Sequence, residues 1–170
     1  DPVAGVEMAS TGEVATFGDN LEEAFYLSWL ATDQKIAGKN IFLSLPPEQK
    51  HKFVDEAAQL VEDGWKIYTT QGTHDYLASH DITTTKLYKI SDKKEPSVHS
   101  ALMDKKFDLV INIPTPLDVS PDGGTIRRLA IDNQVPLLTN PETGRLLLRC
   151  LADPELKDIQ PKYWQEYVPQ

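Results

Sequence analysis

The sequence has a single cysteine, Cys150, and this scarcity excludes two kinds of architecture. One thiol forms no disulfide within the chain, and no Cys-x-x-Cys or Cys/His spacing provides a metal site. Cys150 lies in the apolar run 146–151, which is typical of a buried structural thiol. A chain with one cysteine and no internal disulfide suits a reducing compartment, so we expect a cytoplasmic location. Because the sequence opens on Asp1-Pro2-Val3, we interpret it as a fragment without its targeting region, which leaves a mitochondrial location open.

Positive charge is also scarce, with 17 Lys and Arg against 26 Asp and Glu and a net charge of −9. No Lys/Arg-rich run exists, which argues against nucleic acid as a partner. No apolar run approaches the length that spans a membrane, so no membrane partner is expected. In so acidic a chain, an anion can bind only locally, to a few placed cations and backbone N–H groups.

Familiar catalytic motifs are missing as well. The sequence contains no G-x-S-x-G, no H-E-x-x-H, no P-loop and no glycine fingerprint of a dinucleotide-binding fold. Its histidines are not spaced as metal ligands, and Asp108 is interpreted as a strand-boundary residue and not as a general base. We therefore expect no catalytic residue, no metal and no cofactor in this chain.

From Asn40 onward, short apolar runs alternate with segments of helical periodicity. This alternation predicts an α/β fold with a five-stranded, mainly parallel sheet and helices on both faces. The strands are expected at 41–45, 65–68, 83–90, 108–113 and 135–139. The helices are expected at 47–63, 73–80, 97–105, 125–133 and 142–152, and Gly64 is expected to cap the first of these.

The first thirty-odd residues form a separate arm in this interpretation. A turn is expected at 10–14, followed by a helix over 21–32 with Asn20 as its N-cap and Glu23 completing a capping box. The broad apolar face of this helix must cover either this domain or a neighbouring chain. A polar linker, 33–39, and a tail, 154–170, which is expected to wrap the surface, complete the organisation.

The stretch from Ile67 to His74 is the most informative local pattern. A β-branched and aromatic run ends there in Thr69-Thr70-Gln71-Gly72-Thr73 and opens a helix. Helix-start N–H groups are unpaired and the helix dipole favours negative charge, so such a turn can hold an anion. On its own, Thr-x-Gly-Thr fits a plain helix N-cap equally well.

Polar residues follow several of the other expected strands. In a parallel sheet, ligands sit beyond the carboxyl ends of the strands, which places these residues at one edge. The expected site combines side chains with the backbone N–H groups of Gly72 and Thr73 and would bind a phosphate or carboxylate. Its predicted residues are Lys50, Thr70, Gly72, Thr73, Lys89, Asn112, Arg127 and Arg128, with Thr139 and Asn140 at the end of the fifth strand.

Several segments resemble a known family in order and spacing. Residues 7–14, followed by Phe17-Gly18, resemble the segment that closes the second ATP-grasp unit of the carbamoyl-phosphate synthase large chain. Residues after about Asn40 resemble the C-terminal regulatory domain of that enzyme, eukaryotic type, which has the methylglyoxal-synthase-like fold. The matching motifs are Thr69-Thr70-Gln71-Gly72-Thr73, Asp108-Leu109-Val110-Ile111-Asn112, Ile126-Arg127-Arg128-x-Ala130 and Pro136-Leu137-Leu138-Thr139-Asn140. The resemblance implies that residues 1–35 are a remnant of the preceding unit and 36–170 the regulatory domain.

The resemblance also implies a function. The domain would control a parent ligase that uses ATP and Mg²⁺ to make carbamoyl phosphate, for pyrimidine or arginine synthesis, from glutamine or ammonia and bicarbonate. Its partners would be a small anionic effector, the ATP-grasp domains of the same chain and a glutaminase. Lys50, Thr70, Thr73 and Lys89 stand where nucleotide-regulated members hold the effector phosphate. Members that respond to N-acetylglutamate have a tryptophan at the position of Lys89, so a nucleotide such as UMP or UTP is expected and N-acetylglutamate is the alternative.

Two rival functions remain open. One is a lyase of the methylglyoxal synthase type, whose catalytic aspartate lies in a Gly-Gly-Asp loop. This chain has Ser91-Asp92-Lys93-Lys94-Glu95 at that place and Ile113-Pro114 in place of a Trp-Asp pair, and both departures argue against that chemistry. The other rival is a purely structural or oligomer-forming domain that has lost its ligand.

Overall fold

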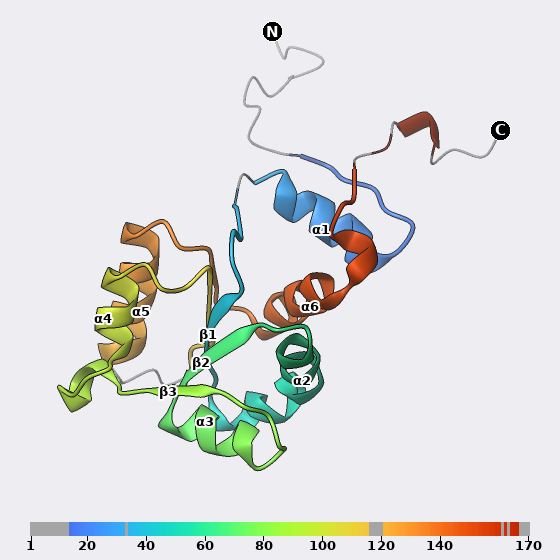
Figure 1. Ribbon diagram of the computed structural model, residues 1–170. Helices are drawn as coiled ribbons and strands as arrows, with labels where there is room; N and C mark the ends of the chain where they lie inside the picture. Colours follow the sequence, from blue (N-terminus) through green and yellow to red (C-terminus); the bar gives the residue numbers. More distant parts are fainter. Residues whose placement is uncertain (1–13, 33, 116–120, 161, 163, 167–170) are drawn as a thin grey trace, which may run out of the picture.

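A computed structural model describes residues 14–32, 34–115, 121–160, 162 and 164–166 of the chain (Figure 1). Most of the turn expected at 10–14, and the motif at 7–14 except Val14, lie outside these residues. None of the helices in the described part has both the length and the apolar character that a membrane crossing requires.

The centre of the fold is a five-stranded sheet in which every pair of neighbouring strands is parallel. The strand order is β3-β2-β1-β4-β5. The strands are β1 (Asn40–Ser44), β2 (Lys66–Thr70), β3 (Thr85–Leu87), β4 (Leu109–Asn112) and β5 (Leu137–Leu138). Phe42 of β1 lies opposite Tyr68 of β2 and Val110 of β4. The predicted α/β class and parallel sheet are therefore confirmed.

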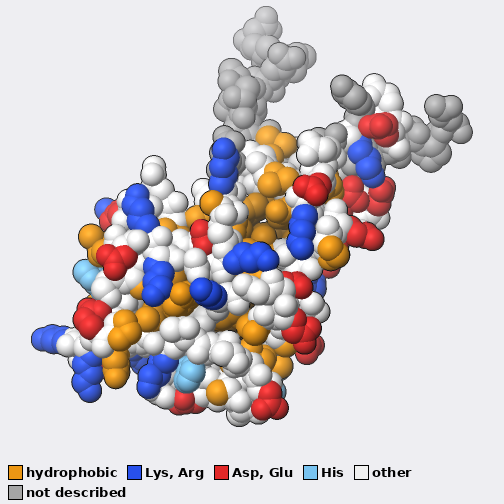
Figure 2. Space-filling view, viewed as in Figure 1, with side chains coloured by type: hydrophobic (Ala, Val, Ile, Leu, Met, Phe, Trp, Pro, Cys, Tyr) orange, Lys and Arg blue, Asp and Glu red, His pale blue; other side chains and the backbone are white. Residues whose placement is uncertain are grey.

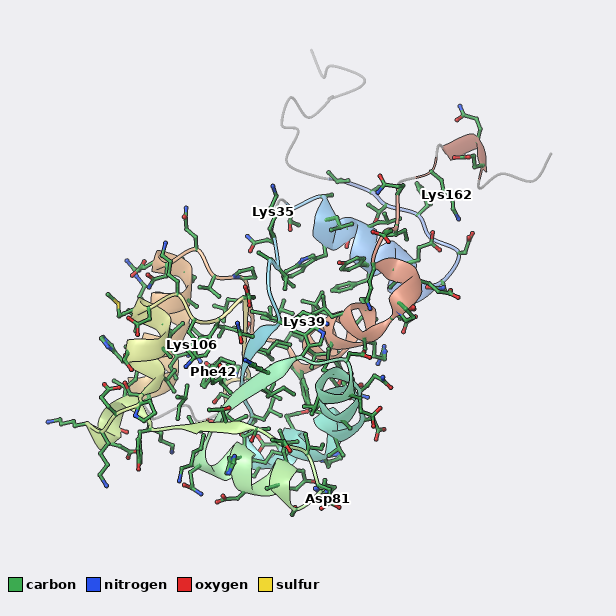
Figure 3. The ribbon with its side chains drawn as sticks, viewed as in Figure 1. Lys35, Lys39, Phe42, Asp81, Lys106 and Lys162 are labelled. Atoms are coloured by element: carbon green, nitrogen blue, oxygen red, sulfur yellow. The ribbon has the colours of Figure 1, made fainter. Side chains whose placement is uncertain are left out.

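Helices cover both faces of this sheet (Figure 1). One layer contains α2 (Val54–Glu62), α3 (Gln71–Ala78) and α6 (Pro141–Ala152), and the other contains α4 (Val98–Met103) and α5 (Pro121–Asp132). Side chains of a strand alternate between its faces, so Ile41 and Leu43 pack in the first core cluster and Phe42 in the second. Figure 3 shows Phe42 between the sheet and the layer of α4 and α5, where its ring lies 5.3 Å from that of Phe107.

The N-terminal helix α1 (Leu21–Leu30) covers this domain itself. Its side chains Phe25, Tyr26 and Trp29 pack against the first core cluster, and the helix lies beside α6 (Figure 1). Asn20 caps it as predicted, because its Oδ1 accepts the N–H of Glu23 at 2.8 Å. The Glu23 carboxylate accepts from the N–H of Asp19, one residue before the position that a capping box uses.

Cys150 of α6 is a buried thiol, as predicted. Its Sγ donates to the carbonyl oxygen of Glu22 in α1 at 3.4 Å. Burial, followed by the negative charge of Glu22, raises the pKa of the Cys150 thiol to about 12. The thiol therefore stays protonated and unreactive at neutral pH, where it joins α1 to α6.

Several predicted boundaries were wrong. The helix expected over 47–63 begins as a 3₁₀ helix, η1 (Pro47–Phe53), before α2. The strand expected over 83–90 contains only the three residues of β3, and Ile90–Asp92 forms a second 3₁₀ helix, η2. Short 3₁₀ turns also occur in the described part of the tail, η3 (Pro154–Leu156) and η4 (Trp164–Glu166). The tail contacts the arm through an ion pair of 2.7 Å between Lys162 and Asp19.

Candidate functional site

A cavity of about 340 Å³ opens at the carboxyl edge of the sheet. β2 and β3, the next strands in sequence, lie on one side of β1, and β4 and β5 lie on its other side. The direction in which strands are added to the sheet therefore reverses at β1. The crevice at such a switch point is the usual ligand site of an open parallel sheet. The cavity is lined from both sides of β1, by Ser44, Leu45, Pro46, Pro47, Lys50, Thr70, Gly72, Thr73, Lys89, Asn112, Ile113, Pro114, Thr115, Asp122, Gly123, Ile126 and Arg127.

Seven of the ten predicted site residues line this cavity, which is electrostatically unlike the rest of the chain. Among its described lining residues are three cations, Lys50, Lys89 and Arg127, and one carboxylate, Asp122. The whole chain has a net charge of −9. Figure 2 shows acidic side chains gathered beside α6 and α2, in the layer to which α1 also belongs. The excess of positive charge in the cavity is therefore local, as binding of an anion requires.

The Thr70–Thr73 turn forms one wall. Thr70 is the N-cap residue of α3, but its side chain makes no capping hydrogen bond. A plain helix cap would use that hydroxyl for the helix N–H groups, so the geometry favours a site for a ligand over a cap. Thr73 is 2% exposed, and its Oγ1 accepts the N–H of Leu45 at 3.3 Å. The same hydroxyl donates to the carbonyl oxygen of Leu45 at 3.5 Å, so the pair of bonds ties the turn to the end of β1. The donated bond is long and therefore weak, and an anion in the cavity would compete with Leu45 for this proton.

The two lysines approach from different elements. Lys50, in η1, donates from Nζ to the carbonyl oxygen of Gly72 at 2.6 Å, which fixes its ammonium at the start of α3. Lys89 follows β3 and is exposed, and its backbone N–H donates to the carboxylate of Asp92 at 3.1 Å. The two cations therefore reach the cavity from the segments that follow β1 and β3, the strands on either side of β2.

The opposite wall comes from β4 and α5. Asn112 is 4% exposed, and its Oδ1 accepts from Nη1 of Arg127 at 2.8 Å. Because this bond uses the amide oxygen, it orients the side chain and leaves Nδ2 as a donor. β2 and β4 flank β1, so the two walls are about two strand spacings, or about 10 Å, apart. A ligand that contacts both walls needs an anionic group and a second polar group at that separation.

Asp122 is a site residue that the sequence did not reveal. It is 8% exposed, and its Oδ2 accepts two hydrogen bonds from Ser91, from the backbone N–H at 3.1 Å and from Oγ at 2.7 Å. These bonds connect η2, which follows β3, with the first turn of α5 beside the cavity. The segment 114–124 was expected to be a loop, so nothing marked one of its carboxylates as buried.

Arg128, in contrast, does not line the cavity. Its side chain is 79% exposed and pairs with Asp132 at 3.1 Å on the outer face of α5. Successive residues of an α-helix point about 100° apart, so Arg127 and Arg128 cannot both face the cavity. Thr139 and Asn140 do not line it either. The Asn140 side chain instead caps α6 by accepting the N–H of Thr143 at 3.0 Å.

The remaining polar candidates have structural partners. Nδ1 of His74 lies 2.7 Å from Oγ1 of Thr84, and the exposed carboxylate of Asp75 accepts from Nε2 of Gln71 at 2.6 Å. Asp108 accepts from the backbone N–H of Asn40 at 2.9 Å, which confirms it as a strand-boundary residue. Within the described residues, no group of three or more His, Cys, Asp or Glu side chains could hold a metal ion.

Comparison with known proteins agrees with this fold. A family model described as "MGS-like domain" matches residues 52–139, more than half of the chain. The chain is 39% identical to "Multifunctional protein URA2" of Saccharomyces cerevisiae in an alignment of 164 positions that covers 89% of this chain and 7% of that protein. It is 36% identical over 156 residues to human "Carbamoyl-phosphate synthase [ammonia], mitochondrial", at 89% of this chain and 10% of that protein. The chain thus spans a tenth or less of the length of these relatives.

A solved structure shows the same fold at low sequence identity. The crystal structure of methylglyoxal synthase from Elizabethkingia anophelis NUHP1 superposes with a TM-score of 0.55 and 14% identity, covering 78% of this chain and 93% of that chain. At this identity the likeness concerns the fold alone. Together with the family match over 52–139, the parallel sheet and its covering helices show that this chain belongs to the MGS-like domain family.

Proposed function

We propose that this chain is the effector-binding regulatory domain of a carbamoyl-phosphate synthase, and that a nucleotide such as UMP or UTP binds in the cavity at the carboxyl edge of the sheet. The observation that carries the proposal is the local charge of that cavity. Lys50, Lys89 and Arg127 converge with the unused hydroxyl of Thr70 in a chain whose net charge is −9. Charged donors and a helix start are the groups that bind phosphate.

The names of the relatives support the parent enzyme that we propose. Those named carbamoyl-phosphate synthase or multifunctional protein are about ten or more times longer than the matched segment, and we propose that catalysis belongs to other parts of such a protein. We propose that this domain itself makes no carbamoyl phosphate and contacts the ATP-grasp domains of the same chain and a glutaminase. The parent enzyme would use ATP and Mg²⁺ and would serve pyrimidine or arginine synthesis. Its compartment is proposed to be the cytoplasm, with the mitochondrion as the alternative that the name of the human relative suggests.

A nucleotide suits the cavity better than N-acetylglutamate does. Lys50 and Lys89 together match the charge of about −2 that a phosphate monoester concentrates on one group, whereas N-acetylglutamate carries its two charges on separate carboxylates. The second wall offers the amide donor of Asn112 to the hydroxyl or carbonyl oxygens of a nucleoside. The distance between the walls, about 10 Å, fits a ligand with a phosphate at one end and a base at the other.

Thermal-shift screening against UMP, UTP, IMP, phosphoribosyl pyrophosphate and N-acetylglutamate tests this proposal. A ligand at a hundred times its Kd stabilises the folded state by about 2.7 kcal/mol. For a chain of this size, that raises Tm by about 5–11 °C. A shift with a nucleotide supports the proposal. No shift with any of the five anions, even at millimolar concentration, would favour the structural domain that has lost its ligand.

The Thr73→Ala variant is expected to bind the effector about tenfold more weakly, because a hydrogen bond to a charged group contributes about 1.5 kcal/mol. Titration calorimetry measures this loss directly. Thr73→Ser retains the hydroxyl and should keep most of the affinity. Thr69→Ala is a matched control, because Thr69 is buried on β2 with no hydrogen-bond partner for its Oγ1 and does not line the cavity. Equal affinities in Thr73→Ala and Thr69→Ala would contradict the role of Thr73.

The lyase alternative predicts release of phosphate from dihydroxyacetone phosphate, and we expect none above the buffer background. Abstraction of a carbon-bound proton needs a carboxylate that is free and close to the substrate. Asp92 accepts from the backbone N–H of Lys89, and Glu95 accepts from Ser97 and Ser100. Asp122 lines the cavity, but Ser91 occupies its Oδ2 with two hydrogen bonds. Release that is abolished by Asp92→Asn or Asp122→Asn would establish the lyase instead.

A further inference from the structure

We infer that Tyr76 is a positioning residue that holds the ammonium of Lys50 at the mouth of the anion cavity. The inference rests on the proposed anion site and adds to it a residue that does not line the cavity. Nζ of Lys50 lies 5.9 Å from the centroid of the Tyr76 ring and donates to the carbonyl oxygen of Gly72 at 2.6 Å. A cation within about 6 Å of an aromatic face is attracted by the ring quadrupole.

The two contacts come from one face of α3. Gly72 and Tyr76 are four residues apart in this helix, so the Gly72 carbonyl and the Tyr76 ring belong to neighbouring turns of the same face. Glycine also leaves room for the lysine, because a Cβ at position 72 would lie 3.3 Å from Nζ of Lys50. The face therefore combines a hydrogen-bond acceptor, an aromatic ring and space for an ammonium.

The ring is itself held in place. Tyr76 packs against the first core cluster, and its ring lies 4.7 Å from the imidazole of His80, at an interplanar angle of 37°. Nδ1 of His80 also lies 2.9 Å from the backbone oxygen of Tyr76. A ring with this support offers Lys50 a fixed surface.

Fixing Lys50 favours anion binding for an entropic reason. A lysine side chain has several rotatable bonds, and ordering it when the ligand binds reduces the affinity. An ammonium has three donors, so the bond to Gly72 leaves two N–H groups for an anion. Tyr76 would act on the ligand only through Lys50, which makes its effect dependent on that lysine.

The test is a double-mutant cycle with inorganic phosphate as the ligand, followed by the NMR shifts of the Gly72 and Thr73 amides. Tyr76→Leu removes the ring and is expected to weaken phosphate binding about threefold to fivefold. Tyr76→Phe retains the ring and should bind within about twofold of the unmodified chain. In a Lys50→Met background, Tyr76→Leu should cause no further loss. Amide shifts of the folded molecule report the affinity even if a variant has lower stability.

A second readout is the chemical shift of the Lys50 ε-methylene protons, which a nearby aromatic ring displaces upfield. Tyr76→Phe should preserve this displacement and Tyr76→Leu should abolish it. If Lys50→Met weakens phosphate binding while Tyr76→Leu has the same effect in both backgrounds, the role of Tyr76 is overturned and the anion site stands. If Lys50→Met leaves phosphate affinity unchanged, the anion site itself is overturned, and the role of Tyr76 with it.

Discussion

Replacing Glu56 with alanine is expected to lower the free energy of unfolding by about 2–3 kcal/mol, since loss of this buried carboxylate leaves Arg145, among the described residues, with only its 4.0 Å contact to Glu142. The Glu56 side chain is 4% exposed, and its Oε1 lies 2.8 Å from Nη2 of Arg145 and 3.7 Å from Nη1 of Arg149. Arg149 in turn pairs with Glu22 of α1 at 3.1 Å. The two arginines are partly exposed, so water compensates some of the loss and the effect stays below that of a fully buried pair.

Urea and thermal unfolding measure the effect, which corresponds to a fall in Tm of about 4–12 °C. Glu142→Ala is the matched control. Glu142 also pairs with Arg145, at 4.0 Å, but its side chain is 67% exposed, so its removal should cost less than about 0.5 kcal/mol. A loss in Glu56→Ala no larger than in Glu142→Ala would show that this network does not stabilise the packing of α1, α2 and α6.

The arrangement of the sheet could be predicted from the sequence because its strands are buried on both faces. Ile41-Phe42-Leu43 and Leu109-Val110-Ile111 are continuous apolar runs, which is the pattern of central parallel strands. Once the strands are parallel, their carboxyl ends share an edge. That geometric rule correctly predicts that six of the site residues converge on one cavity: Lys50, Thr70, Thr73, Lys89, Asn112 and Arg127.

The errors have local physical causes. α5 begins at Pro121 and contains Gly123-Gly124, a pair with poor helix propensity that indicates a loop in sequence, so Asp122 was missed. Arg127 and Arg128 form one basic doublet in the sequence, and only the phase of the helix separates the residue in the cavity from the exposed one. The helix after Thr70 begins earlier than expected, at Gln71, which places Gly72 and Thr73 in its first turn. The assignment of residues 1–35 to a preceding unit stays a prediction.

The residue at position 89 is expected to decide which effector binds. Lysine places a compact cation beside the phosphate position, whereas tryptophan would remove the charge and fill its space with an apolar ring. Lys89→Trp should therefore reduce nucleotide affinity by about tenfold to a hundredfold, since a hydrogen bond from a charged donor contributes about 1.5–3 kcal/mol. Nucleotide binding to the unmodified chain should also weaken as salt rises, because part of the attraction is screened.

Titration calorimetry of UMP and N-acetylglutamate against the unmodified chain and two variants tests this expectation. Lys86→Trp is the matched control, because Lys86 is an exposed lysine of β3 that lies over the Tyr88 ring and does not line the cavity. UMP should bind the unmodified chain and the Lys86→Trp variant with similar affinity, and it should bind the Lys89→Trp variant much more weakly. The unmodified chain should bind UMP more tightly than it binds N-acetylglutamate. Tight binding of N-acetylglutamate to the unmodified chain, with no measurable heat from the nucleotide, would show that Lys89 does not select a phosphate ligand.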